Sequence, residues 1–274
     1  MLASAIIVFR ETLEAALIIG IIAAATHHLK SRNAWLLTGI AAGIAGALIV
    51  AVLAGRIAEL AAGFGQEIFN AAILGVAAAM LAWHNIWMAR HGAAMAGEAK
   101  SLGHAVGTGA RGMSALCIVI ALAILREGSE TALFLYGLLA GSTEPAATVL
   151  SGGAVGLLAG AIAGYGLYAG FLRIPARRLF TVTSVLILLL AAAMSSQMAK
   201  FLVQADVLPS LANPFWDTSW LLTNGSAPGR VFHALIGYEA TPSGIQILFY
   251  AVTLLLILAG MHLSRRGPPR SPAT

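Results

Sequence analysis

The sequence predicts an all-α integral membrane protein with seven transmembrane helices, made of two inverted three-helix repeats and a C-terminal helix. Three observations support this fold class: the composition is strongly apolar, the basic residues lie on alternate connections, and one charged motif occurs twice. Hydrophobic residues make up 59% of the 274 residues and charged residues only 10%, with a mean hydropathy of +0.88. Soluble domains carry about 25% charged residues, so this composition is typical of a protein that lies almost wholly in a membrane.

Hydropathy divides the chain into seven apolar segments, each long enough to cross a hydrocarbon layer of about 30 Å as a helix. Their approximate ranges are 2–25, 34–54, 67–89, 113–140, 148–172, 178–203 and 244–263. The segments lack the strict alternation of barrel strands, which favours helices. The longest connection, about 204–243, contains turn-forming prolines, but its residues 231–236 place apolar side chains at helical spacing. We therefore expect a structured external cap rather than a solvated loop.

Basic residues predict the orientation, because cytoplasmic connections carry an excess of Lys and Arg. With the N-terminus outside, eleven basic residues fall on the cytoplasmic side: Lys30, Arg32, Arg90, Lys100, Arg111, Arg173, Arg177, Arg178, Arg265, Arg266 and Arg270. Only Arg56, Lys200 and Arg230 fall on the other side. The sequence thus predicts N-out and C-in. This topology and contact with anionic membrane lipid account for the net charge of +5, and nothing indicates a nucleic-acid partner.

One charged motif, Arg-Glu-x-x-Glu, lies in the middle of both the first and the fourth segments. Its copies are Arg10, Glu11 and Glu14, and Arg126, Glu127 and Glu130. A charged side chain near the bilayer centre costs about 2.5–3.5 kcal/mol, so six unpartnered ones would cost on the order of 15 kcal/mol. The six side chains must therefore pair with one another or with a ligand.

The two motifs belong to a longer internal similarity. Residues 9–24 and 125–140 share six identities in sixteen aligned positions, at an offset of 116 residues. This offset pairs the first three segments with the next three, and because three is odd the second copy enters the membrane upside down, as in many transporters. The expected organisation is one polytopic membrane domain, 1–274, with repeat one at about 1–90, repeat two at about 113–204, the cap at about 204–243 and the seventh helix at about 244–263.

Helical spacing predicts a metal site. Residues three or four apart share a helix face, so each motif presents two carboxylates beside one guanidinium. Four carboxylates from two repeats suit a hard cation such as Fe(III), Mn(II), Mg(II) or Ca(II), and Fe(II) is acceptable. We predict Glu11, Glu14, Glu127 and Glu130 as ligands, with Arg10 and Arg126 balancing their charge. Fully ionised, the set sums to −2, which leaves the oxidation state open. The alternative is a packing network that binds no ligand.

Two further groups of polar residues are candidates for the route of an ion. Pathway candidates within the third and sixth segments are His84, Asn85, Ser195, Ser196 and Gln197. Candidates for the outer mouth are Asp206, Asp217 and Glu239. Interhelical hydrogen bonds and ordinary loop charges explain the same residues without any role in transport.

At the two motifs the chain resembles the iron permease family, which includes the oxidase-dependent iron transporters of fungi and the permease of the bacterial three-component iron uptake system. The family hallmark is Arg-Glu-x-x-Glu in the first and fourth of seven spans, and residues 216–219 and 233–238 also resemble the family, although Ser129 stands where Leu is more familiar. The resemblance implies a permease rather than an enzyme. It would move Fe(III) or Fe(II) into the cytoplasm across a bacterial inner membrane.

The resemblance further implies that iron is a transported substrate and that no cofactor is permanently bound. It also implies an oxidase, a peroxidase or an iron-binding protein as an extracytoplasmic partner. Two alternatives remain at this stage. One is a membrane-embedded di-iron enzyme, although neither motif has the Glu-x-x-His spacing common in such sites. The other is a transporter or channel for another cation, such as lead or manganese.

Overall fold

The computed structural model describes residues 1–61, 65–141, 145–170 and 176–266, and within these ranges every regular element is a helix. The helices are α1 (Leu2–Ala25), α2 (Arg32–Ala61), α3 (Gln66–Gly107), α4 (Ser114–Gly141), α5 (Ala146–Tyr168), α6 (Ala176–Gln204), α7 (Ala227–Ile236) and α8 (Gly244–Arg266). The all-helical prediction is confirmed. Of the sequence-based assignments, residues 171–172, Arg173 and Arg270 lie outside the described residues.

Among the described residues, five helices contain stretches long and apolar enough to cross a membrane: Arg32–Arg56, Gln66–Ala89, Ala146–Tyr168, Arg178–Gln204 and Gly244–Ser264. Helices α1 and α4 are comparable in length, with 24 and 28 residues. They differ from the other five because each carries the three charges of an Arg-Glu-x-x-Glu motif in its middle. Composition alone thus separates the two helices that hold the charged side chains from those around them.

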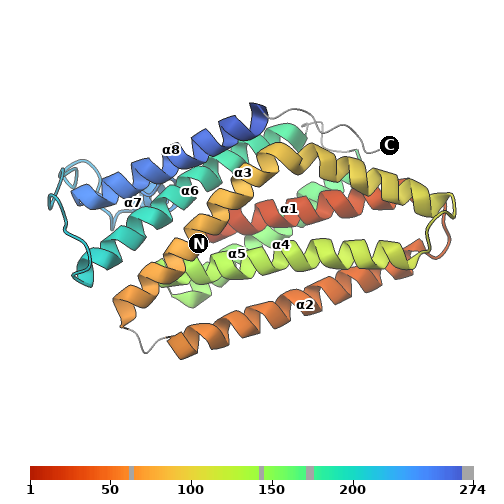
Figure 1. Cartoon of the computed structure of the whole chain (residues 1–274), viewed down its shortest axis with the longest axis horizontal. Helices are drawn as coiled ribbons and strands as arrows, with labels where there is room; N and C mark the ends of the chain where they lie inside the picture. Colours follow the sequence, from red (N-terminus) through yellow and green to blue (C-terminus); the bar gives the residue numbers. More distant parts are fainter. Residues whose placement is uncertain (62–64, 142–144, 171–175, 267–274) are drawn as a thin grey trace.

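Helix α3 is longer than its apolar segment predicts. The sequence placed a connection after residue 89, but the helix continues to Gly107 and changes direction along its length (Figure 1). Ala99, Leu102 and Val106 recur on one face of this extension and are buried against Ile22 and Leu116. The prediction was wrong here because charged residues lower the hydropathy of a segment that is amphipathic and still helical.

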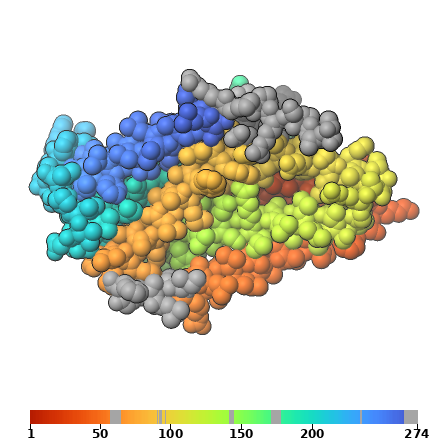
Figure 2. Space-filling view, in the orientation of Figure 1, coloured from red at the N-terminus to blue at the C-terminus, as the bar shows by residue number. Residues whose placement is uncertain are grey.

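The helices pair across the two halves of the chain. Helix α1 packs chiefly against α5, α2 against α4, and α3 against α6, while α8 covers α6 and α3. Figure 1 shows α2 beside α4 at one edge and α8 beside α6 at the other, and in Figure 2 α4 is exposed between α2 and α3.

Glycine allows the closest of these approaches. A Cβ atom at Gly156 of α5 would lie 2.3 Å from the carbonyl oxygen of Ala5 in α1, and one at Gly39 of α2 would lie 2.7 Å from that of Cys117 in α4. Small residues at such spacing let membrane helices approach backbone to backbone. Each motif helix is therefore held against a glycine-bearing helix of the other half.

The segment between α6 and α8 is folded, as the spacing in residues 231–236 predicted. Ser226 caps α7 by accepting a hydrogen bond from the Gly229 N–H at 3.0 Å, and Gly237 ends the helix with a φ of 70°. The Tyr238 hydroxyl donates to the Leu222 carbonyl at 2.8 Å, which ties the two sides of the segment together.

Candidate metal site

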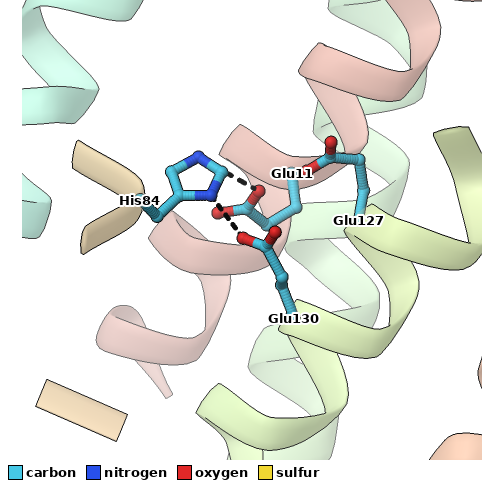
Figure 3. A group of neighbouring side chains, drawn as sticks. All are labelled: Glu11, His84, Glu127 and Glu130. Carbon is cyan, nitrogen blue, oxygen red and sulfur yellow. Dashed lines mark hydrogen bonds and ion pairs between the residues drawn. The ribbon is translucent and has the colours of Figure 1, made fainter. Parts of the chain in front are cut away.

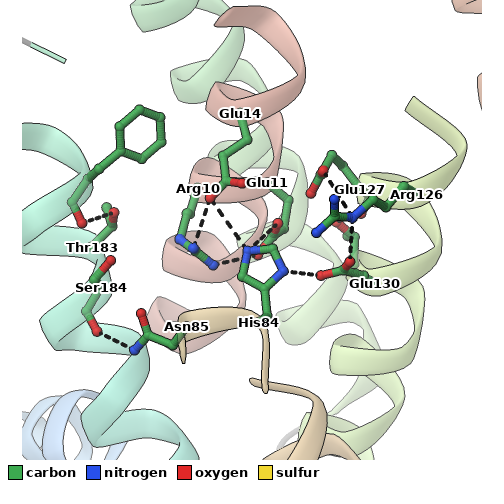
Figure 4. A network of polar contacts seen from close by, with 12 residues as sticks. Arg10, Glu11, Glu14, His84, Asn85, Arg126, Glu127, Glu130, Thr183 and Ser184 are labelled. Atoms are coloured by element: carbon green, nitrogen blue, oxygen red, sulfur yellow. Dashed lines mark hydrogen bonds and ion pairs between the residues drawn. The ribbon is translucent and has the colours of Figure 1, made fainter. Parts of the chain in front are cut away.

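Both charged motifs lie at the centre of the helix bundle. Arg10, Glu11, Glu14 and Glu127 are each less than 5% exposed, whereas 18% of the Glu130 side chain and 35% of the Arg126 side chain are exposed. The structure therefore brings together all six side chains that the sequence singled out, although it buries the first motif more deeply than the second. Figure 4 shows them grouped around one point between α1, α3 and α4.

In the first motif, one guanidinium serves both carboxylates. Arg10 Nη1 lies 3.2 Å from Glu11 Oε1, and Arg10 Nη2 lies 2.9 Å from Glu14 Oε1. This geometry follows from the local sequence, because residues at i and i+4 meet on one side of a helix.

In the second motif, Arg126 likewise lies near both carboxylates, and it also contacts a tryptophan of α3. Arg126 Nε lies 3.1 Å from Glu130 Oε1 and 3.7 Å from Glu127 Oε1. The guanidinium carbon also lies 4.2 Å from the ring centroid of Trp87, a cation–π contact that orients the arginine.

His84 of α3 connects the two motifs. Its Nδ1 shares a hydrogen bond with Glu130 Oε2, while its Nε2 lies 3.6 Å from Glu14 Oε1 and 3.9 Å from Glu11 Oε2. The sequence analysis named His84 as a pathway candidate within the third segment. The structure places it beside both motifs.

Four of these side chains have the geometry of a metal site. One ligand atom each from Glu11, His84, Glu127 and Glu130 can be chosen so that all lie within 4.8 Å of one another (Figure 3). Glu14 is not part of this closest group, although Arg10 and His84 hold it beside the group. The predicted set of four glutamates is thus present, but the tightest cluster contains three glutamates and a histidine.

Several carboxylate oxygens in the cluster are buried without hydrogen bonds. Among the described residues, both oxygens of Glu127 and Oε2 of Glu11 have no hydrogen-bond partner. Burying a polar atom without a partner costs roughly 1–3 kcal/mol, and more when the atom is charged. A cation bound between the two motifs would remove this cost, which favours a ligand site over a packing network.

The other pathway candidates lie apart from this cluster or at its edge. Asn85 donates from Nδ2 to the Ser184 carbonyl at 3.0 Å and so faces α6, as Figure 4 shows. Ser195 accepts a hydrogen bond from Thr253 of α8 at 2.7 Å. Ser196 is buried and Gln197 is half-buried, and in the described part of the chain neither has a hydrogen bond to a motif residue.

Each of the three candidates for the outer mouth has a different environment. Asp206 is exposed. Asp217 accepts hydrogen bonds from the Ser219 N–H at 2.9 Å and the Ser219 hydroxyl at 2.5 Å, which lower the pKa of its carboxyl below the usual value. Glu239 accepts a hydrogen bond from Asn224, and its Oε2 lies 3.9 Å from Lys200 Nζ, so its charge is already partnered.

A pocket of about 630 Å³ leads to the cluster between α3 and α4. It is lined by Val76, Ala79, Met80, Trp83, His84, Trp87, Arg126 and Glu130. The two most exposed members of the charged cluster, Arg126 and Glu130, thus form the wall through which the site can be reached.

Apolar spanning helices around a buried cluster of acids define a membrane permease for metal ions. The pattern that defines the iron permease FTR1 family matches residues 1–264, and the chain belongs to this family. It therefore takes part in the transport of iron across a membrane.

Curated relatives agree with this assignment. The chain is 26% identical to the ferrous iron permease EfeU of Yersinia pestis, over 98% of this chain and 94% of the relative. It is 27% identical to EfeU of Escherichia coli O157:H7, over 98% of this chain and 96% of the relative. No solved structure was found to match the chain.

Proposed function

We propose that the protein moves iron across the bacterial inner membrane into the cytoplasm, through a site in which Glu11, Glu14, Glu127 and Glu130 replace the hydration shell of the ion. The observation that carries this proposal is that Glu11 and Glu127, 116 positions apart, belong to one buried cluster with unsatisfied oxygens. Arg10 and Arg126 balance the carboxylates and hold them in place.

The transport topology is proposed as seven spans with the N-terminus outside and the C-terminus inside. Two inverted repeats and a seventh helix, α8, make up the single membrane domain, with residues 204–243 as an external cap. The pairing of α1 with α5 and of α4 with α2 supports the repeats, because a two-fold exchange of the halves converts the first pair into the second. Movement of one repeat against the other then exposes the site to each side in turn.

Access to the site is proposed to run through the pocket between α3 and α4. Arg126 is 35% exposed along this pocket, and a guanidinium that faces lipid at this depth is costly. Water in the pocket removes that cost and provides a path for a hydrated ion. The ion meets Glu130 first and the more deeply buried Glu127 and Glu11 afterwards.

The cargo is proposed to be Fe(II), since the curated relatives carry the name ferrous iron permease. An extracytoplasmic oxidase, peroxidase or iron-binding protein is the proposed partner in iron delivery, and membrane lipid surrounds the spans. His84 adds a histidine to the cluster, but it lies on α3 and does not create the Glu-x-x-His spacing that is common in di-iron enzymes. The family is also one of permeases, which favours transport.

Uptake into proteoliposomes tests the proposal. Glu11→Gln and Glu127→Gln each remove one charge and one ligand oxygen from the cluster while preserving side-chain volume. We expect both variants to insert and fold but to lose at least nine-tenths of labelled Fe(II) uptake. Glu98→Gln, at an exposed position of α3, is the control and should transport like the unmodified protein. Unchanged uptake in both cluster variants would refute the proposed site.

A further inference from the structure

We propose that His84 is a ligand of the transported ion, through Nε2, and that this nitrogen gives the site its preference for Fe(II) over harder divalent cations. The inference rests on the proposed function, and it goes beyond the all-carboxylate site that the repeated motif describes. It assigns to α3, which carries no copy of the motif, a direct part in choosing the ion.

The position of His84 is the first argument. The residue is 3% exposed and lies between the two motifs, with a carboxylate facing each ring nitrogen. Metal–ligand bonds of about 2.1 Å place opposed ligand atoms roughly 4.2 Å apart. His84 Nε2 already lies 3.9 Å from Glu11 Oε2 and 3.6 Å from Glu14 Oε1, so a bound ion requires only a small displacement of these atoms.

The hydrogen bond at Nδ1 is the second argument. Histidines that bind metals usually donate the N–H of one ring nitrogen to a carboxylate, which orients the ring and leaves the other nitrogen free to bind. His84 has this arrangement: Nδ1 is hydrogen-bonded to Glu130, and Nε2 has no hydrogen-bond partner among the described residues. Glu130 is engaged on both sides, because its other oxygen is paired with Arg126.

This arrangement gives the glutamates different roles. Glu11 and Glu127 keep oxygens without hydrogen bonds for the ion, whereas Glu130, besides contributing to the site, orients the imidazole at the pocket wall. The two halves of the protein thus contribute unequally, although each carries the same motif. Glu14 lies 3.6 Å from Nε2, close enough to share the ion with the histidine.

Ligand chemistry then gives the selectivity. Carboxylates alone suit Mg(II), Ca(II) and Mn(II), whereas imidazole suits the later first-row ions, including iron. A neutral imidazole also leaves the charge of the cluster unchanged.

Nitrogen coordination can be measured directly with Mn(II) as a paramagnetic probe. Electron spin echo envelope modulation of the Mn(II)-loaded, detergent-purified protein should show ¹⁴N coupling from a directly bound imidazole. The coupling should vanish in His84→Gln, while Mn(II) still binds through the carboxylates with a lower affinity. His104→Gln, an exposed histidine on the same helix, is the matched control and should keep both coupling and affinity.

A second variant separates loss of the ligand from loss of the fold. His84→Asp restores a ligand but makes it an oxygen. We expect it to keep Mn(II) uptake within about threefold and to lose at least tenfold in the ratio of Fe(II) to Mn(II) uptake. The inference is overturned if Mn(II) bound by the unmodified protein shows no ¹⁴N coupling, or if His84→Asp keeps the Fe(II) preference. Either result leaves the carboxylate site intact, whereas failure of the protein to bind Mn(II) at all overturns the proposed function as well.

Discussion

Arg10 and Arg126 occupy the same position in the two motifs but lie in different environments. Arg10 is 1% exposed and touches both carboxylates of its own motif, whereas Arg126 is 35% exposed and rests on Trp87. Removing one partner of a buried ion pair leaves a charge that neither water nor protein compensates. At a partly exposed position, water can solvate the carboxylate that is left without its arginine.

The two arginines should therefore differ in their effect on stability. We expect Arg10→Met to lower the free energy of unfolding by about 3–5 kcal/mol, the usual cost of breaking a buried pair. Arg126→Met should lower it by clearly less, since solvent in the pocket reaches Glu130. Thermal unfolding of the purified variants in detergent measures both effects, and equal losses would contradict the assigned burial.

The site residues differ in how far the sequence alone could predict them. The six motif residues were predicted from their charge within apolar segments, from the repetition of the motif and from helical spacing, since pairs at i, i+3 and i+4 meet on any helix. His84 comes from a helix that carries no motif, and only the packing of α3 against α1 and α4 brings it to Glu130. The available signal was an ionisable side chain within an apolar segment, which made His84 a candidate without indicating its partner.

At the scale of the elements, the motif helices depend on glycine-bearing neighbours. Gly152, Gly156, Gly160 and Gly164 of α5 are buried along the contact with α1. The sequence predicted the positions of these helices from hydropathy, but not which helices would pair, since pairing depends on how two surfaces fit. The extension of α3 was not predicted for a related reason: its apolar face is buried only by contact with residues of α1, α2 and α4.

Gly156→Ala tests the close contact between α1 and α5. The added methyl group would lie 2.3 Å from the Ala5 carbonyl oxygen, so the helices must separate, and we expect a loss of about 1–3 kcal/mol. Iron uptake should fall with it, because α1 carries Glu11. Gly97→Ala is the matched control: no atom lies within 4 Å of a Cβ there, so replacing a helical glycine should stabilise α3 by about 0.5–1 kcal/mol. Thermal unfolding should show a lower stability for Gly156→Ala and a higher stability for Gly97→Ala. Destabilisation by both substitutions would contradict the close contact between α1 and α5 as the cause.

The whole molecule is asymmetric about the charged cluster, despite the repeated plan. Helix α8 covers α6 and α3, and the pocket between α3 and α4 opens beside the second motif, whose Arg126 and Glu130 line it. The pocket between α3 and α4 is the feature that a transport experiment should address.

Cysteine accessibility tests whether this pocket contains water. The single native cysteine, Cys117, can be replaced by alanine, and Ala79→Cys then places one thiol on the pocket wall. We expect a charged, membrane-impermeant thiol reagent to modify this position, because thiolates form and react only where water is present. Bound Mn(II) should slow the modification by closing the route to Glu130. Leu158→Cys, at a position of α5 that is 63% exposed and outside the pocket, should resist the charged reagent because it faces lipid. If only a membrane-permeant reagent modified Ala79→Cys, the pocket would contain lipid, and the ion would have to reach the cluster by another path.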